Sequence, residues 1–249
     1  MRKKIATSTI LAAVALLGAP AATMAHGDTT EPAEDPALCA PYMAINAAFA
    51  GEPDPASIEE LLVEAEAAAP EDVADTLGVL TGAVRTILET GDFAAFETPE
   101  VTEAKSEMDM WVFESCAFDT KLEVSATDYA FGGLPEELPA GSVAIVLHND
   151  GEESHEIVLL RKLEDTTESW DELLALPQDE ILSKAEFVGV SFVPAPGTVG
   201  VLTGELVAGE YIALCFIPEG SVAGSEGSVA PDAMPHFMHG MRHEFTVTG

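Results

Sequence analysis

The sequence predicts an α+β protein with two domains, an N-terminal helical bundle followed by a Greek-key β-sandwich. Two observations support this fold class. Apolar residues recur at helical spacing up to about residue 118, and short β-rich runs separated by Gly and Pro follow from there. We therefore divide the chain into a signal peptide at 1–25, an acidic linker at 26–36, the bundle at 37–118 and the sandwich at 119–249.

Residues 1–25 have the pattern of a secretory signal peptide. Three basic residues follow Met1, residues 10–17 form a short apolar segment, and small residues precede a cleavage site after Ala25. The apolar segment is too short to span a bilayer comfortably, which favours cleavage over anchoring. We expect a soluble, extracytoplasmic protein in the secreted, periplasmic or cell-wall space, with no membrane span after cleavage.

The chain is strongly acidic. It carries 44 Asp and Glu residues against 10 Lys and Arg, a formal net charge of −34, and the signal peptide contributes only basic charges. Such a surface repels nucleic acids and anionic membranes, so we expect neither as a partner. Two explanations stay open, general solubility in a saline habitat and attraction of a cationic partner. Because the acidic residues are spread along the whole chain, the first is favoured.

Four helices are predicted in the N-terminal half, and we expect them to form an up-and-down bundle. Their boundary signals are, in chain order, the segment Cys39–Phe49, a capping box at Ser57 and Glu60, a stop before Gly91, and an N-cap at Thr98 with Pro99 as the first helical residue. The carboxylates of this half look solvent-exposed, without partners of opposite charge at useful spacing. We interpret this half as a structural or partner-binding bundle without catalytic residues.

Three cysteines in an exported protein leave one thiol over. Cys39 lies near the start of the first predicted helix and Cys116 at the end of the last, and these ends can meet in an antiparallel bundle. We expect a Cys39–Cys116 disulfide, which would stabilise the domain by on the order of 4 kcal/mol in the chain-entropy model. Cys215 lies far away in the sequence and is expected to remain a free thiol with another purpose.

The C-terminal half has the pattern of a β-sandwich. A turn at residues 149–151 (NDG) separates two β-rich runs, and Trp170–Lys184 has the apolar spacing of a helical insertion. The expected strands are Lys121–Tyr129, Ser142–Leu147, His155–Leu160, Glu186–Val193, Val199–Thr203, Glu210–Ile217 and Arg242–Thr248. Several short strands with Gly and Pro between them are typical of a sandwich.

Four residues of this half have the types that a type 1 copper site needs. Such a site holds copper with two imidazoles and one thiolate, and a thioether binds weakly on the axis. His155 opens a strand after the turn, and Cys215 ends another strand. His236 and Met241 follow in the next loop, with four residues between them. Each residue alone has an ordinary explanation, but an unpaired thiol in this order indicates metal binding.

Residues 119–249 resemble the cupredoxins, the family of plastocyanin and azurin. The turn that ends at His155 (NDGEESH) is similar to the Asn-x-Gly turn before the family's first ligand, and the strand that ends at Cys215 (GEYIALC) is similar to the one that delivers its thiolate. The run from Pro235 to Met241 (PHFMHGM) is similar to the Pro-His…Gly-Met run of plastocyanin. The helical half carries no such resemblance.

The resemblance implies a cupredoxin-like sandwich with one type 1 copper. His155, Cys215 and His236 would be its equatorial ligands and Met241 its axial ligand. His239 competes with His236 for the second imidazole, and the Pro-His register favours His236.

Two features depart from the family's pattern. Twenty residues separate Cys215 from His236, where the family has only a few, and Glu156 stands where plastocyanin and azurin have Asn. Both features favour an alternative in which the sandwich holds no copper.

The first hypothesis is an exported type 1 copper-binding protein that transfers one electron to or from an unidentified redox partner protein. The resemblance implies that His236 is the electron port and that Phe237 and Met238 form an apolar docking rim. Because no nucleophile–base pair or open hydrolytic metal site appears, we expect an electron carrier or binding protein and not an enzyme. Two alternatives stay open, a copper-free cupredoxin-fold secreted interaction module and an extracytoplasmic copper carrier that uses the same ligands.

Overall fold

The computed structural model describes residues 35–48, 54–224 and 229–249. The predicted signal peptide at 1–25 lies outside these residues, as does most of the predicted linker at 26–36. Asp35–Gly249 forms one compact unit. Among the described residues, no helix combines the length and the apolar character that crossing a membrane requires.

The N-terminal half is helical, as predicted. Its helices are α1 (Cys39–Ala48), α2 (Pro55–Ala68), α3 (Ala74–Thr90) and α4 (Pro99–Ser115), with a short 3-10 helix, η1 (Phe93–Glu97), before α4. Gly91 closes α3 with a φ of 70°, a left-handed conformation that glycine adopts without strain. Thr98 caps α4, and its hydroxyl accepts a hydrogen bond from the N–H of Val101. Both boundary predictions are confirmed.

The predicted capping box at the start of α2 is wrong. Asp54 is the N-cap, and its carboxylate accepts hydrogen bonds from both the N–H and the hydroxyl of Ser57. Pro55 begins the helix, since its fixed φ suits the first helical position and its missing N–H is not needed there. Ser57 therefore lies inside the first turn.

A disulfide joins Cys39 to Cys116, as predicted, and ties the start of α1 to the end of α4. Both half-cystines belong to the apolar core of the helices, together with Leu62, Leu77 and Met108. Cys215 is a free, buried thiol.

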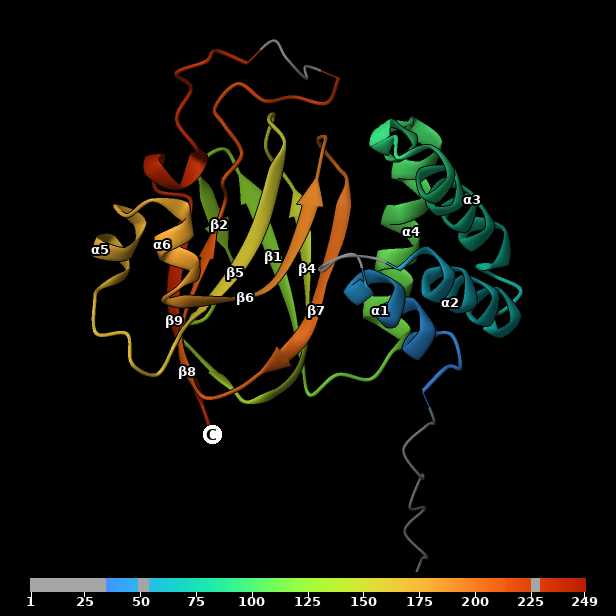
Figure 1. The fold of residues 1–249 in the computed structure, drawn as a ribbon, viewed down its shortest axis with the longest axis horizontal. Helices are drawn as coiled ribbons and strands as arrows, with labels where there is room; N and C mark the ends of the chain where they lie inside the picture. The colour runs from blue at the N-terminus through green and yellow to red at the C-terminus, as the bar shows by residue number, and fades with distance from the viewer. Residues whose placement is uncertain (1–34, 49–53, 225–228) are drawn as a thin grey trace, which may run out of the picture. The chain divides into compact units, whose positions relative to one another are not determined.

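The C-terminal half is a β-sandwich of two mixed sheets (Figure 1). One sheet has the order β2-β1-β4-β7 and the other β3-β9-β8-β5-β6. The strands are β1 (Thr120–Thr127), β2 (Ala130–Gly132), β3 (Glu137–Pro139), β4 (Gly141–Asn149), β5 (His155–Lys162), β6 (Ala185–Val193), β7 (Val199–Leu206), β8 (Gly209–Leu214) and β9 (Arg242–Thr248). The seven predicted strands are present. The sequence prediction misses β2 and β3, because three-residue strands at a sheet edge are too short to show a period.

Strand β4 is buried on both faces. Val143, Ile145 and Leu147 point into the core between the sheets, while Ala144 and Val146 pack in the core of the helices. This two-sided burial explains why the strand reads as a continuous apolar run rather than an alternating one.

Asp109 of α4 fastens the helices to the four-stranded sheet. Its carboxylate is 1% exposed, accepts hydrogen bonds from the N–H of Val201 in β7 (3.0 Å) and the hydroxyl of Tyr42 in α1 (3.3 Å), and pairs with Lys105. The expectation that carboxylates of this half lack partners is wrong at Asp109, and also at Glu59 and Glu66, which pair with Arg85. Lys105 and Asp109 are four residues apart in the helix, so their side chains lie on the same face.

The predicted helical insertion consists of two short helices, α5 (Trp170–Leu174) and α6 (Gln178–Leu182). Ser169 and Glu172 form a capping box at the start of α5. Both helices cover the outer face of the five-stranded sheet, where Trp170 and Ile181 pack on Leu160. The two sheets are therefore covered on opposite outer faces, and the ends of the strands remain available for a site (Figure 1).

Candidate metal centre

The predicted ligands come together at one end of the sandwich core. His155 is the first residue of β5, and Cys215 directly follows β8. His236 opens a 3-10 helix, η2 (His236–His239), and Met241 lies between η2 and β9. All four side chains are 0% exposed, and Cys215 and Met241 belong to the apolar core between the sheets.

Three ligand atoms face one point. The Nδ1 atoms of His155 and His236 lie 3.2 Å apart, and the Sγ atom of Cys215 lies 3.4 Å from Nδ1 of His236. One ligand atom of each residue lies within 4.8 Å of the others. Among the described residues, no other set of His, Cys, Asp and Glu side chains forms such a group of three.

Both imidazoles are held by carboxylates at their other nitrogen. Nε2 of His155 lies 3.1 Å from Asp128, and Nε2 of His236 lies 3.0 Å from Glu153. An ionised carboxylate can only accept a hydrogen bond, so each ring carries its hydrogen on Nε2 and a lone pair on Nδ1. Without a cation, the two Nδ1 lone pairs would oppose each other at 3.2 Å. A soft metal ion between two imidazoles and a thiolate removes this conflict, so the donor set fits copper.

Burial sets the protonation of the ligands. It raises the pKa of Cys215 from 9.0 to about 12, so the thiol keeps its proton at neutral pH until a metal displaces it. Burial also lowers the pKa of His155 below its ordinary value, although Asp128 acts in the opposite direction. The histidine is therefore neutral, as a metal ligand must be.

Backbone hydrogen bonds link the ligand residues to one another. The N–H of Met241 donates to the carbonyl of His236 (3.1 Å), and the N–H of Cys215 donates to the carbonyl of Met241 (3.2 Å). The N–H of Phe237 returns to the carbonyl of Cys215 (2.9 Å). These bonds hold Met241, the predicted axial residue, next to Cys215 and His236.

The long segment between the thiol and the second histidine is closed at its base. Pro218 and Pro235 form an isolated β-bridge, and the N–H of Glu219 donates to the carbonyl of Met234 (2.9 Å). The N–H of His236 also donates to the carbonyl of Ile217 (2.9 Å). Because the two ends of the insertion meet, it does not separate the ligands.

Glu156, the second departure from the family pattern, also contacts this region. Its backbone N–H approaches the sulfur of Cys215 at 3.5 Å, and its carboxylate accepts a hydrogen bond from the N–H of Phe216 (3.1 Å). Burial raises the pKa of the Glu156 carboxyl. The glutamate therefore joins β5 to the segment after Cys215, which is compatible with an intact site.

The turn before His155 is held by the side chain of Asn149. Its amide donates to the carbonyls of Glu153 (2.8 Å) and Val193 (3.1 Å), and its oxygen accepts the N–H of Gly151 (3.0 Å). This is the physical role of the Asn-x-Gly pattern, since the asparagine side chain completes the turn.

The two histidines considered for the second ligand position have different surroundings in the structure. His236 lies in the cluster, whereas Nε2 of His239 pairs with Glu219 at 2.8 Å. The side chain of His236, the implied electron port, is fully buried, and Met238, at 60% exposure, is the exposed residue of the predicted rim.

Sequence reasoning misses three residues that surround the histidines, namely Asp128, Tyr129 and Glu153. Tyr129 adopts a φ of 68°, its ring edge contacts His236 with 5.0 Å between centroids, and its hydroxyl donates to Glu153 (3.1 Å). Glu153 lies within the turn segment and Asp128 lies 27 positions before His155, but among 44 acidic residues neither carries a distinguishing signal.

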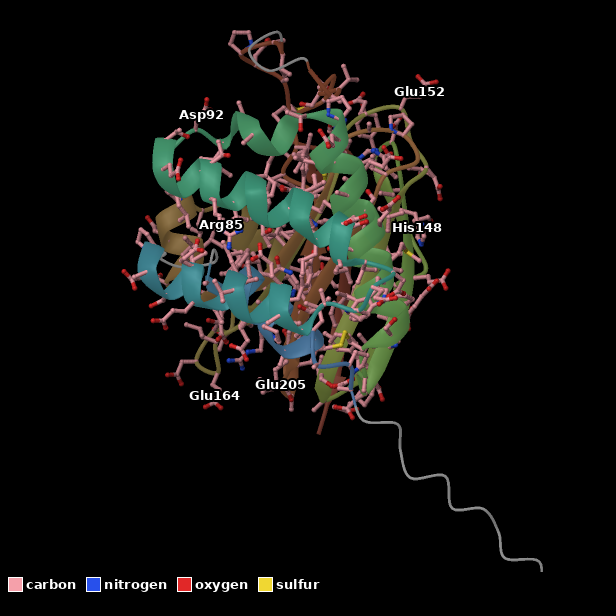
Figure 2. All side chains as sticks on the ribbon, turned by 90° about the vertical axis from the view of Figure 1, so that its right-hand side faces the viewer. Arg85, Asp92, His148, Glu152, Glu164 and Glu205 are labelled. Atoms are coloured by element: carbon pink, nitrogen blue, oxygen red, sulfur yellow. A yellow bond between two sulfur atoms is a disulfide. The ribbon has the colours of Figure 1, made fainter. Side chains whose placement is uncertain are left out.

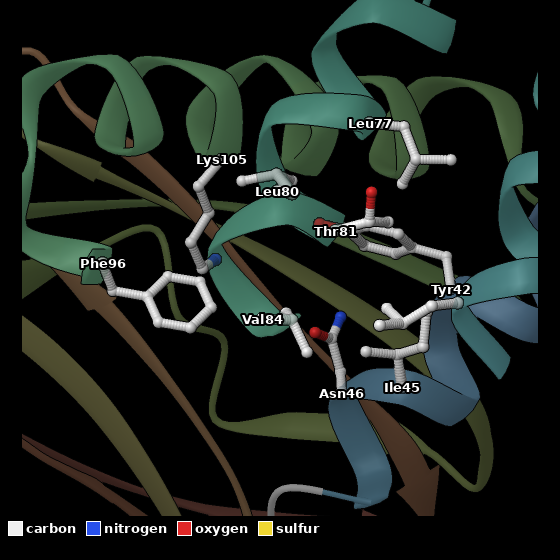
Figure 3. Close-up of a pocket in the computed structure, with 10 residues that line it drawn as sticks. Tyr42, Ile45, Asn46, Leu77, Leu80, Thr81, Val84, Phe96 and Lys105 are labelled. Atoms are coloured by element: carbon white, nitrogen blue, oxygen red, sulfur yellow. The ribbon is translucent and has the colours of Figure 1, made fainter. Parts of the chain in front are cut away.

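A cavity in the helical half is a second candidate site (Figure 3). Its lining is mostly apolar and includes Leu80 and Phe96. Three of its polar groups have partners, because Lys105 pairs with Asp109, the hydroxyl of Tyr42 donates to Asp109 and the hydroxyl of Thr81 donates to Glu66. Asn46 is a further polar side chain of the lining.

No protein-family model and no curated protein matches this chain. Among solved structures, it is similar to auracyanin B, with 22% identity, 53% of this chain and 91% of that chain covered, and a TM-score of 0.35. It is similar to a dithionite-reduced auracyanin from the photosynthetic bacterium Roseiflexus castenholzii (22% identity, 52% and 97% covered, TM-score 0.33). It is also similar to auracyanin A, a "blue" copper protein from Chloroflexus aurantiacus (19% identity, 51% and 98% covered, TM-score 0.31). These neighbours are cupredoxins, matched over about half of this chain.

Proposed function

We propose that this chain is an exported protein that binds one copper ion in a type 1 site and carries single electrons. His155, Cys215 and His236 would hold the ion, and Met241 would supply the weak axial thioether. Copper would supply the one-electron couple. The partner would be a redox protein, and the chain would act as a carrier rather than as an enzyme.

The observation that carries this proposal is the convergence of two imidazole Nδ1 atoms and a thiol within 4.8 Å. Each histidine is held at its far nitrogen by a carboxylate, and backbone bonds link Cys215, His236 and Met241. Ligands that are fixed before the metal arrives move little when its charge changes. Little movement favours rapid electron transfer.

Burial favours an electron carrier over a copper carrier. A copper carrier passes its ion on through ligands that an acceptor protein can reach. Here His155, Cys215 and His236 are all 0% exposed. A copper-free interaction module, in turn, has no need for two buried imidazoles whose lone pairs face a free thiol.

The first test is the visible spectrum of the purified protein loaded with Cu(II). We expect an intense thiolate-to-copper band that disappears in Cys215→Ser and His236→Ala. His239→Ala is the matched control, since His239 lies outside the cluster, and its band should remain. A colourless wild-type protein without bound copper would contradict the proposal. A coloured protein that cannot be reduced and reoxidised reversibly would instead support the copper carrier.

A further inference from the structure

We propose that Asp128 and Glu153 are positioning residues that fix the tautomer of both histidine ligands and that their charges favour Cu(II) over Cu(I). The inference rests on the copper function proposed above. It assigns two residues that lie outside the ligand set and that no motif in the sequence marks.

Glu153 is the centre of a hydrogen-bond network. One carboxylate oxygen accepts from Nε2 of His236 (3.0 Å) and from the N–H of Gly220 (2.6 Å). The other oxygen accepts from the hydroxyl of Tyr129 (3.1 Å). The side chain is 17% exposed. Three donors from three segments therefore hold this carboxylate against the His236 ring.

Asp128 plays the matching part at His155. Its Oδ1 atom receives the N–H groups of Glu152 (3.0 Å) and Glu153 (3.2 Å) and lies 3.1 Å from Nε2 of His155. All three partners are N–H groups that donate, which is the arrangement an ionised carboxylate accepts.

Gly151 provides the space for the contact between Asp128 and His155. A Cβ atom at this position would lie 2.4 Å from Oδ1 of Asp128 and 2.6 Å from Nε2 of His155. Any other residue would separate the carboxylate from the imidazole. Gly151 is thus required for the contact between Asp128 and His155 as well as for the turn.

The two carboxylates act on the oxidation state through their charge. Reduction adds one electron from the partner and lowers the charge of the ion by one, with no change in the protons held by the histidines. A negative charge one imidazole away stabilises the more positive form, and the effect is stronger where water is excluded. Both imidazoles are 0% exposed and the Glu153 side chain is 17% exposed, so water screens their interaction little. Asp128 is 35% exposed, so water screens its charge more and its effect should be the smaller of the two.

The test separates charge from hydrogen bonding. In Glu153→Gln and Asp128→Asn the amide oxygen still accepts the imidazole N–H, but the charge is lost. We expect the affinity for Cu(II) to fall by about 10- to 100-fold relative to Cu(I). This fold-change raises the reduction potential by about 59 to 118 mV. Glu152→Gln is the control, because it removes the same charge from an exposed neighbour in the sequence (Figure 2).

A second readout follows the tautomer in the metal-free or zinc-loaded protein. The Nε2–H signal of His236 in NMR spectra should be slow to exchange with solvent in wild type and in Glu153→Gln. It should exchange rapidly in Glu153→Ala, which lacks the acceptor. Potentials in Glu153→Gln and Asp128→Asn equal to that of Glu152→Gln would overturn the charge effect, and a slowly exchanging signal in Glu153→Ala would overturn the positioning effect. A wild-type protein without a copper band contradicts the proposed function, and the tautomer measurement still decides on positioning.

Discussion

The Cys215 thiol and the His155 imidazole have different protonation states in the metal-free site. Burial keeps Cys215 protonated, with a pKa of about 12, whereas it lowers the pKa of His155 and leaves that ring neutral. The histidine can therefore bind a metal at neutral pH without losing a proton. The thiol must release one, because only the thiolate is a ligand. Metal binding is thus coupled to a single proton.

This coupling predicts that copper affinity increases with pH. Between about pH 7 and pH 9 the thiol is protonated and His155 is neutral, so each pH unit should tighten binding about tenfold. Competition titrations against a chelator of known pH dependence measure the slope. In Cys215→Ser the affinity should be weaker and its slope should vanish. A wild-type affinity that does not change with pH would mean that the sulfur is not a ligand.

At the scale of elements, buried polar contacts decide how the helices lie on the sheet. The apolar surfaces of α4 and β7 would permit several registers, but Asp109 meets the N–H of Val201 in only one. The hydroxyl of Ser106 adds two bonds to the backbone of Val199, at 2.9 and 3.1 Å. These contacts also satisfy backbone groups of β7, which lies at the edge of its sheet.

We expect Asp109→Ala to lower the free energy of unfolding by about 2–3 kcal/mol, because it leaves the N–H of Val201 and the hydroxyl of Tyr42 without their acceptor. Urea unfolding, followed by the fluorescence of Trp111 and Trp170, measures this loss. Glu103→Ala is the control on the same helix, since Glu103 is exposed. Equal stability of the two variants would show that Asp109 contributes nothing to the docking of α4.

On the scale of the whole molecule, the excess of negative charge dominates. Six basic side chains of the described residues pair with carboxylates, as in the contacts of Arg85 with Glu59 and Glu66 or of Arg161 with Glu186. Because the sequence has 44 acidic residues against 10 Lys and Arg, most carboxylates cannot be paired. Figure 2 shows labelled examples in separate parts of the chain, among them Asp92, Glu164 and Glu205. Such a distribution repels itself in the folded state.

Salt should therefore stabilise this protein. Raising sodium chloride from about 10 mM to about 1 M shortens the Debye length from about 30 Å to about 3 Å and screens this repulsion. We expect a gain of about 1 kcal/mol or more, equivalent to about 2–4 °C in the midpoint of thermal unfolding. A midpoint that falls with salt would show that the ion pairs outweigh the repulsion.

The order of the elements follows from local patterns in the sequence. The stop at Gly91, the start at Thr98 and Pro99, and the seven longer strands depend on nearby residues, so the sequence determines them. The Cys39–Cys116 pairing follows because two cysteines lie at matching helix ends. The order of His155, Cys215, His236 and Met241 in the sequence identified the site. The structure brings the first three together and buries all four.

Only the tertiary structure decided what surrounds these residues. Asp128 and His155 are 27 positions apart in the sequence, and Glu153 and His236 are 83 apart. No local pattern predicts such contacts. The chain has 44 acidic residues, and the sequence does not distinguish one that contacts an imidazole from one that lies in solvent. For the same reason, the sequence does not predict the role of Asp109 or the burial of His236. Burial and hydrogen bonding between distant segments exist only once the sheets and helices have packed.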